Sequence, residues 1–181
     1  MMKIFQTQKH NSFNLDQDLD IRLLKKKDLT ALEWEGQYVH FRNVYAQAYQ
    51  QSQKGQSILW VAELSEYGII GQVFIQLICD RNELANGKTR AYLYSFRIKT
   101  DFQNLGIGSM ILTNTESDLK KRGYRQISLN VAKENSRAQS FYYRHGFRTI
   151  AHEAGCWSYK DHKGVTRHVN EPAWRMFKSL D

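Results

Sequence analysis

Two kinds of hydrophobic pattern alternate along this chain. Apolar runs rich in β-branched and aromatic residues predict β-strands, and they cover 21–24, 58–64, 69–78, 92–98, 126–131, 147–150 and 172–178. Apolar residues spaced three or four positions apart predict helices over 34–53 and 107–122, and a short helix after Asn135. Another short helix is predicted after Asp28, a favourable N-cap residue. The pattern therefore predicts a domain that mixes strands and helices.

The order of these elements indicates how the sheet is built. The four residues 65–68 join two predicted strands, which is typical of an antiparallel hairpin. The segments 92–98, 107–122 and 126–131 form a strand–helix–strand unit, whose two strands are expected to lie parallel. We therefore predict an α+β fold with a mixed, mostly antiparallel central sheet flanked by helices. The residues 156–170, which are polar and aromatic, are expected to form a hairpin loop at the rim of a site.

Length and composition are typical of a soluble protein. The chain has 181 residues, of which 41% are hydrophobic and 24% charged. We interpret residues 1–18 as a polar N-terminal arm and 19–181 as a single domain. No apolar run is long enough for a membrane span or a signal peptide, so we expect a cytoplasmic protein without a membrane partner.

The net charge of +8 favours an anionic partner. The basic residues lie in small groups such as 25–27 and 120–122, and no recognition-helix or aromatic RNA motif accompanies them. The charge alone does not choose between a nucleic acid and a phosphorylated cofactor. We interpret the basic groups as solvated faces and predict no nucleic-acid partner. The two cysteines and six histidines show no metal-ligand spacing, so no metal site is predicted.

The turn from Gln103 to Gly108 is the strongest candidate for a binding site. It lies between a predicted strand and a predicted helix, so the unpaired N–H groups of the first helical turn would point outward there. Gly106 and Gly108 carry no Cβ, which lets a ligand approach the backbone closely. This combination predicts an anion site that suits a pyrophosphate.

Two motifs resemble those of the GNAT superfamily of acyl-CoA-dependent N-acyltransferases. The first is the glycine turn itself, with Gln103, Gly106 and Gly108 at the family spacing, although Thr100 stands where a proline is frequent. The second motif comprises Asn135, Ala138, Phe141, Tyr142, Arg144, Gly146 and Phe147, with Phe141 and Arg144 in place of the family's Leu and Lys. The detailed resemblance covers roughly residues 90–150.

The resemblance implies a role for each matching residue, with acetyl-CoA as the co-substrate. The backbone N–H groups that would hold the CoA pyrophosphate belong to Gln103, Asn104, Leu105, Gly106, Ile107 and Gly108. The strand backbone at Phe96, Arg97 and Ile98 would lie against the pantetheine arm, and Asn135 would lie beside the same arm. Tyr142 matches the tyrosine that protonates the departing CoA thiolate in many members, which is the chemistry that an amine attacking a thioester requires.

The sequence defines the acceptor less well. Glu33 and Glu35 lie beside an aromatic stripe, and carboxylates near aromatic rings suit a cationic amine. The general base stays open among these two glutamates, His145 and water, and the acceptor is predicted only as a primary amine. The sequence is equally compatible with a monomer and a homodimer.

Rival functions remain for the same residues. A non-catalytic protein of this fold that only binds CoA would carry the same turn. A dinucleotide-binding enzyme is disfavoured, because the series that begins Gly106-Ile107-Gly108 lacks its third glycine, although Glu134 follows the next strand as a ribose ligand might be expected to.

Overall fold

The computed structural model describes residues 18–180, whose strands form a seven-stranded sheet and a separate two-stranded hairpin. The sheet has the order β1-β2-β3-β4-β5-β9-β6. Its strands are β1 (Leu19–Leu23), β2 (Ser57–Leu64), β3 (Gly68–Gln76), β4 (Arg90–Ile98), β5 (Gln126–Ala132), β6 (Arg148–Glu153) and β9 (Ala173–Ser179). All neighbouring strands are antiparallel except β4 and β5, so the predicted α+β fold with one parallel pair is confirmed. The predicted arm lies outside the described residues, apart from Asp18.

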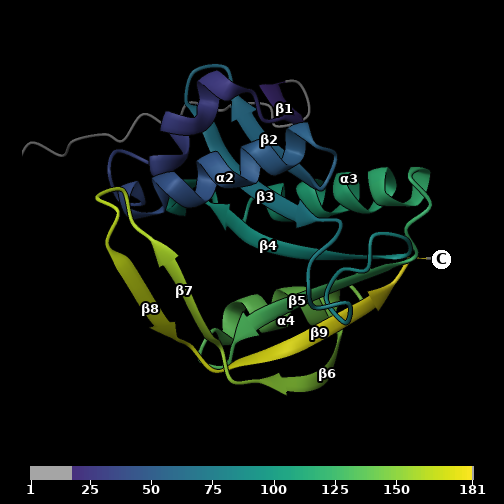
Figure 1. The fold of residues 1–181 in the computed structure, drawn as a ribbon. Helices are drawn as coiled ribbons and strands as arrows, with labels where there is room; N and C mark the ends of the chain where they lie inside the picture. Colours follow the sequence, from purple (N-terminus) through teal and green to yellow (C-terminus); the bar gives the residue numbers. More distant parts are fainter. Residues whose placement is uncertain (1–17, 181) are drawn as a thin grey trace, which may run out of the picture.

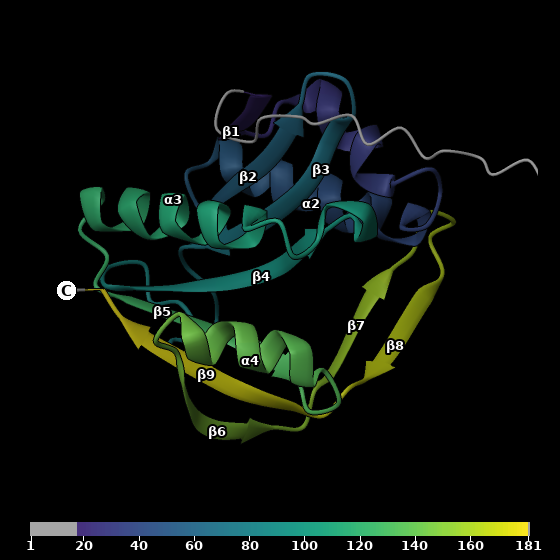
Figure 2. The ribbon, with the colours of Figure 1, turned by 180° about the vertical axis from the view of Figure 1, so that it is seen from behind.

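Helices cover both faces of the sheet. Helix α2 (Arg42–Gln53) lies on one face, whereas α3 (Ile107–Lys121) and α4 (Ser136–Arg144) lie on the other (Figures 1 and 2). Three 3-10 helices complete the fold, namely η1 (Lys26–Glu33), η2 (Val39–Phe41) and η3 (Thr100–Phe102). One hydrophobic core accordingly lies under α3 and α4, and a second lies under α2. Among the described helices, none is long and apolar enough to cross a bilayer.

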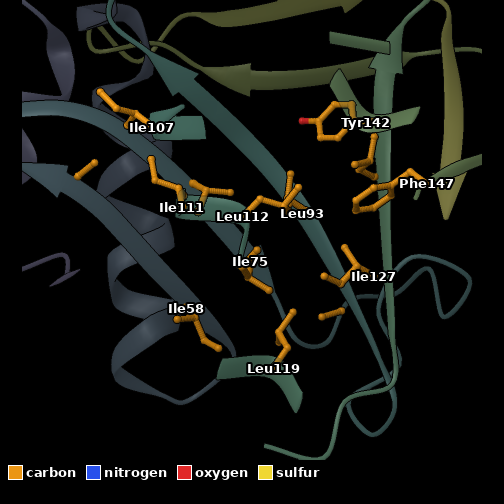
Figure 3. Close-up of a cluster of buried hydrophobic side chains, with 14 of the residues drawn as sticks. Ile58, Ile75, Leu93, Ile107, Ile111, Leu112, Leu119, Ile127, Tyr142 and Phe147 are labelled. Atoms are coloured by element: carbon orange, nitrogen blue, oxygen red, sulfur yellow. The ribbon is translucent and has the colours of Figure 1, made fainter. Parts of the chain in front are cut away.

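The larger core fixes the start of α3 against the sheet. Ile107, Ile111 and Leu119 recur at helical spacing, and each is at most 1% exposed. Figure 3 shows them facing the strand residues Ile75 and Leu93. Burial of each such side chain contributes about 1.5–3 kcal/mol. Because Ile107 is the first residue of the helix, this packing also positions the glycine turn before it.

Strands β4 and β5 pair for only part of their length. Their parallel register runs from Arg90 opposite Gln126 to Leu93 opposite Leu129 and ends there. Beyond this point β4 and β5 diverge (Figure 1). A bulge bends β4 on its other side, where Ser95 has a φ of 51°. The sheet therefore opens beside the C-terminal half of β4.

The helix predicted over 34–53 begins later than expected. Trp34 and Glu35 have φ angles of 43° and 54°, a left-handed conformation that a helix cannot contain, and α2 begins only at Arg42. The aromatic stripe still gathers on one side, because the rings of Tyr38 and Phe41 stack 6.3 Å apart and Phe41 contacts the helix. The spacing thus identified the packing surface but misplaced the helix start.

Asp28 is also one turn away from its predicted role. It is the third residue of η1 and not its N-cap, which is Lys25. Its carboxylate accepts a hydrogen bond from the Lys25 backbone N–H at 2.8 Å and forms an ion pair with Arg22 at 2.7 Å. The carboxylate therefore satisfies the helix start from within the first turn.

Residues 156–170 form a two-stranded hairpin, β7 (Cys156–Lys160) and β8 (Thr166–Asn170). The hairpin leaves the sheet at Gly155 and returns at Glu171, whose N–H donates to the Gly155 carbonyl at 3.0 Å. It crosses the opening of the sheet toward α2 (Figure 1). At its tip the Asn43 side chain donates to the Asp161 carbonyl at 2.5 Å. The hairpin therefore bridges the two halves of the molecule.

Gly155 is expected to be irreplaceable at the base of this hairpin. Its φ is +71°, and an added Cβ would lie 1.7 Å from the Glu171 carbonyl oxygen. Gly164 at the hairpin tip shares the left-handed conformation, with φ +79°, but has open space around its Cβ position. Urea denaturation should show that Gly155→Ala costs on the order of 2 kcal/mol more than the matched Gly164→Ala. If both substitutions lower the free energy of unfolding equally, the backbone at the base of the hairpin can move to accommodate the added Cβ.

Candidate functional site

The glycine turn presents backbone N–H groups at the start of α3. Asn104 and Gly106 both adopt left-handed conformations, with φ of 64° and 84°. Gly106 is the N-cap, so no side chain caps the helix, and its first turn contains no acidic residue. The first N–H groups of a helix have no intrahelical acceptor and carry partial positive charge. The turn can therefore bind an anion through its backbone.

A cavity of about 570 Å³ opens at this turn, and we call it the turn cavity. It brings together most of the residues predicted to contact the cofactor, namely Phe96, Arg97, Ile98, Gln103, Asn104, Gly106, Gly108 and Asn135. Leu105 and Ile107 do not line it, since Leu105 is exposed and Ile107 packs in the core. Both were predicted to act through backbone N–H groups alone. Tyr142 lines the same cavity, from α4.

Two arginines of α4 also line the turn cavity, and the sequence reasoning gave them no role. Arg137 donates from Nη2 to Asn104 Oδ1 at 2.9 Å, which ties α4 to the turn. Arg144 lies two helical turns further on and lines the same cavity. Guanidinium groups bind phosphate oxygens in a bidentate manner, so they extend the anion site beyond the backbone. Their spacing of seven residues on one predicted helix was the signal available in the sequence.

Tyr142 and Tyr143 have different surroundings. Tyr142 is 8% exposed, and burial raises the pKa of its phenol above the ordinary value, so it stays protonated at neutral pH. Its hydroxyl points away from Phe147 and toward the start of α3 (Figure 3). Tyr143 is half exposed, and its hydroxyl lies 2.7 Å from Thr149 Oγ1. Of these two tyrosines, only Tyr142 lines the turn cavity.

His145 is engaged in holding α4 against α3. Its Nδ1 lies 2.8 Å from the Phe141 carbonyl, which can only accept, so the neutral ring carries its proton on Nδ1. Nε2 then accepts from Ser109 Oγ, at 2.9 Å. This pair links the last turn of α4 to the first turn of α3. Both ring nitrogens thus have protein partners.

A larger cavity of about 1100 Å³ lies on the other side of β4, between α2 and the β7–β8 hairpin, and we call it the hairpin cavity. Tyr92, Tyr94 and Asn130 line it from the diverging strands. Burial raises the pKa of Tyr92 to about 12, so its phenol is not a base at neutral pH. The Asn130 Oδ1 is buried without a hydrogen-bond partner among the described residues. The sequence did not single out this residue.

The two glutamates proposed for the acceptor are separated by the turn after η1. Glu33 is buried and accepts two hydrogen bonds from Arg42, at 2.6 and 2.8 Å, which lower the pKa of its carboxyl. Glu35 is exposed and forms an ion pair with Lys99 at 3.0 Å. It lines a third cavity of about 380 Å³, which Arg97 also borders. Glu33 lines none of the three cavities.

Comparison with protein families identifies one match. The sequence model of the acetyltransferase (GNAT) family matches residues 26–147. The chain is 31% identical over 97 residues to a spermidine N(1)-acetyltransferase of Thermoplasma acidophilum, covering 54% of this chain and 55% of that protein. It is 27% identical over 94 residues to N-alpha-acetyltransferase 50 of Danio rerio, covering 51% and 56%. The chain thus spans about half the length of these curated relatives.

Solved structures share the fold over nearly the whole chain. The ribosomal-protein-S18-alanine N-acetyltransferase from Escherichia coli aligns with a TM-score of 0.67 at 20% identity, covering 90% of this chain and 94% of the other. Ard1 from Thermoplasma volcanium gives 0.70 at 15% identity, covering 91% and 99%. The PaiA N-acetyltransferase from Thermoplasma acidophilum, solved in complex with coenzyme A, gives 0.64 at 21% identity, covering 90% and 99%. These similarities establish the architecture.

Gly108→Val is expected to weaken CoA binding. A Cβ at this position would lie 3.4 Å from Phe141 and 4.0 Å from Phe96, so the protein accepts it, but the two methyl groups would occupy the turn cavity. Loss of one charge-assisted hydrogen bond to the pyrophosphate would reduce affinity about tenfold or more. Calorimetry with CoA measures this effect, with Thr113→Val on the exposed side of α3 as the control. Unchanged affinity in a folded Gly108→Val protein would refute the turn as the phosphate site.

Proposed function

The chain belongs to the acetyltransferase (GNAT) family, and from this premise we propose that it transfers the acetyl group of acetyl-CoA to a primary amine by direct attack. One observation carries the proposal. The anion-binding turn and the buried phenol of Tyr142 open into the same cavity, and that cavity meets β4 where the sheet parts. The turn cavity thus offers both a site for the cofactor's phosphates and a proton donor.

The unpaired edge of β4 suits the pantetheine arm. Beyond Leu93 the strand loses its hydrogen-bonding partner β5, so alternate residues of the segment 94–98 direct backbone groups to an edge without a partner strand. One of them, the Ile98 carbonyl, is satisfied by the Gln103 side chain at 2.8 Å. Buried backbone groups need partners, and the amides of a pantetheine arm can supply them to Phe96 and to the Ile98 N–H. The backbone groups of Arg97 point to the other edge, toward Gln72 of β3. Asn135 caps α4 with its side chain and borders the same path.

Tyr142 supplies the proton that the leaving group needs. When an amine displaces the thiolate of CoA, the sulfur requires a proton, and a phenol in hydrogen-bond reach can donate it. The raised pKa keeps the phenol of Tyr142 protonated across the neutral range, so a proton is available for donation to the thiolate. The surrounding core excludes water from its ring.

The amine reaches the thioester from the hairpin cavity. That cavity lies across β4 from the turn cavity, so the two reactants meet at the parting of the strands. Asn130 lines this cavity, where its side-chain amide can form a hydrogen bond to the amine or to a water that removes the amine's proton. His145 has both ring nitrogens occupied, and Glu33 is paired with Arg42, so a bound water is the base that these contacts favour.

A non-catalytic CoA-binding role is the main rival. It would require the turn but would leave the proton donor without use. Thiol release from acetyl-CoA with a panel of primary amines distinguishes the two, because a binding protein would bind CoA and release no thiol above the uncatalysed rate. Release with any amine excludes the rival.

Tyr142→Phe should lower kcat by about 10²-fold, the usual contribution of a general acid. The substitution retains the buried ring and removes only the proton donor. Tyr143→Phe is the matched control, because the neighbouring phenol faces Thr149 at the surface, and its kcat should stay within about twofold. Steady-state kinetics and CoA calorimetry on both variants provide the measurement. Damage confined to Tyr143→Phe would reverse the assignment.

Glu33→Gln and Glu35→Gln should have separate effects. The Glu33 carboxyl has a lowered pKa in the folded state, so its contribution to stability is full above the ordinary pKa of about 4.5 and is lost as pH falls through the lowered value. At pH 7, Glu33→Gln should lower the melting temperature by about 2–4 °C. Glu35→Gln should instead raise KM for a cationic amine and leave stability and CoA affinity unchanged. A normal amine KM in the Glu35 variant would remove both glutamates from the acceptor site.

A further inference from the structure

Arg97 extends from β4 into the half of the site that the cofactor does not use. Successive side chains of a strand point to opposite faces. Phe96 and Ile98 accordingly pack against the core under α3, while the guanidinium of Arg97 reaches the aromatic rings near the start of α2. The side chains of Phe96 and Ile98 thus support the cofactor side, and the side chain of Arg97 belongs to the acceptor side.

The guanidinium is held in one position. Its Cζ lies 4.3 Å from the ring centroid of Tyr38 and 5.0 Å from that of Phe41. One nitrogen, Nη1, donates to the Tyr45 hydroxyl at 2.8 Å. Ser95 lies within 3.4 Å of the same nitrogen and is itself bound by Gln72. The charge is therefore preorganised by cation–π contacts and one strong hydrogen bond.

No carboxylate of the described residues lies within ion-pair distance of Arg97. Four acids near Arg97 or the cavities each have another cation, in the pairs Glu33–Arg42, Glu35–Lys99, Asp161–Arg167 and Glu153–Arg81. Asp101 and Glu171 line cavities as well, but neither forms an ion pair with Arg97. The positive charge of Arg97 is also felt at His40, whose pKa is lowered first by burial and next by Arg97. A half-buried cation without a counter-ion is costly. The guanidinium of Arg97 thus has no counter-ion among the described residues.

We propose that Arg97 binds a carboxylate of the acceptor, so that the substrate is a primary amine that carries an acid group, such as an amino acid. The proposal rests on the proposed acetyl transfer and narrows its acceptor. Arg97 lines all three cavities, and its Nε and Nη2 are left for a bidentate carboxylate. The same charge repels polycationic amines. A CoA phosphate is the other anion that could reach it, and the experiment separates the two.

The aromatic wall suggests which amino acid to use as a probe. Phe41 stacks on Trp157 with ring centroids 6.4 Å apart and contacts Tyr159 at 4.9 Å, so the mouth of the hairpin cavity presents ring faces and edges. An aromatic side chain adds favourable contact there. N-acetylphenylalanine and N-acetylphenylalaninamide are the matching product analogues, because they differ only in the carboxylate.

Calorimetry on CoA-saturated protein tests the proposal without requiring turnover. The wild type should bind the carboxylate analogue about tenfold or more tightly than the amide, the difference that one charge-assisted hydrogen-bonded pair provides. Arg97→Gln should abolish this preference, and Arg97→Lys, which keeps the charge and loses the planar fork, should retain part of it. Arg122→Gln, on an exposed arginine paired with Asp118 on α3, is the control and should behave as the wild type. Melting temperatures of all variants confirm folding.

Each alternative result is distinct. Equal binding of the two analogues by the wild type, no binding of either, or a preference that persists in folded Arg97→Gln protein overturns the proposal. If Arg97→Gln lowers CoA affinity and leaves the analogue preference unchanged, Arg97 binds a CoA phosphate. This result also overturns the proposal. Thiol release with phenylalanine and phenylalaninamide measures the proposed function separately, because equal turnover of both leaves acetyl transfer intact while refuting the role of Arg97. The two amines differ in basicity. We therefore compare the ratio of their turnover rates in the wild type with the same ratio in Arg97→Gln, because the difference in basicity affects both ratios equally.

Discussion

The short pairing of β4 with β5 is the constraint on which the site depends. Each strand is held firmly on its other side, because β5 pairs with β9 along its whole length, from Gln126 to Ala132, and β4 pairs with β3 through a bulge. After Leu93 the two strands therefore follow different halves of the sheet. Backbone groups left without a strand partner must find another acceptor or donor. The separation of β4 from β5 thus leaves an edge of β4 free to bind a ligand, and it opens the space beside that edge.

Successive side chains of β4 point to opposite faces of the sheet, so one face supports the cofactor site and the other faces the proposed acceptor site. Phe96 and Ile98 pack toward the core that supports α3, which keeps the glycine turn in place. Arg97 points to the opposite face and joins the aromatic residues near α2. The bulge at Ser95 sets where this alternation falls relative to the parting. A one-residue change of register would send the charged side chain into the apolar core.

Local chemistry explains which features the sequence predicted. The turn from Gln103 to Gly108 and the start of α4 depend on glycine, an N-cap and helical spacing within about fifteen residues, and these signals lie in the chain itself. The start of α2 was misplaced, because Trp34 and Glu35 adopt left-handed conformations although only the next residue, Gly36, is a glycine. The partner of Glu33 and the cavity around Asn130 arise only from tertiary contacts. A sequence pattern shows which positions are charged, but it does not show which residue forms an ion pair with each of them.

Arg97, which has no counter-ion among the described residues, therefore indicates a feature of the site that neither the glycine turn nor the motif at Asn135 contains. Replacing a half-buried charge by an apolar side chain of similar size is often neutral or stabilising for a fold, and the aromatic rings of Tyr38 and Phe41 would pack on such a side chain equally well. Two residues earlier, Ser95 holds a left-handed φ of 51° that glycine would adopt at lower cost. Both unfavourable features lie in the segment of β4 that leaves its partner strand. Local rules are usually broken where function requires it, and in this chain they are broken on the strand that both cavities share.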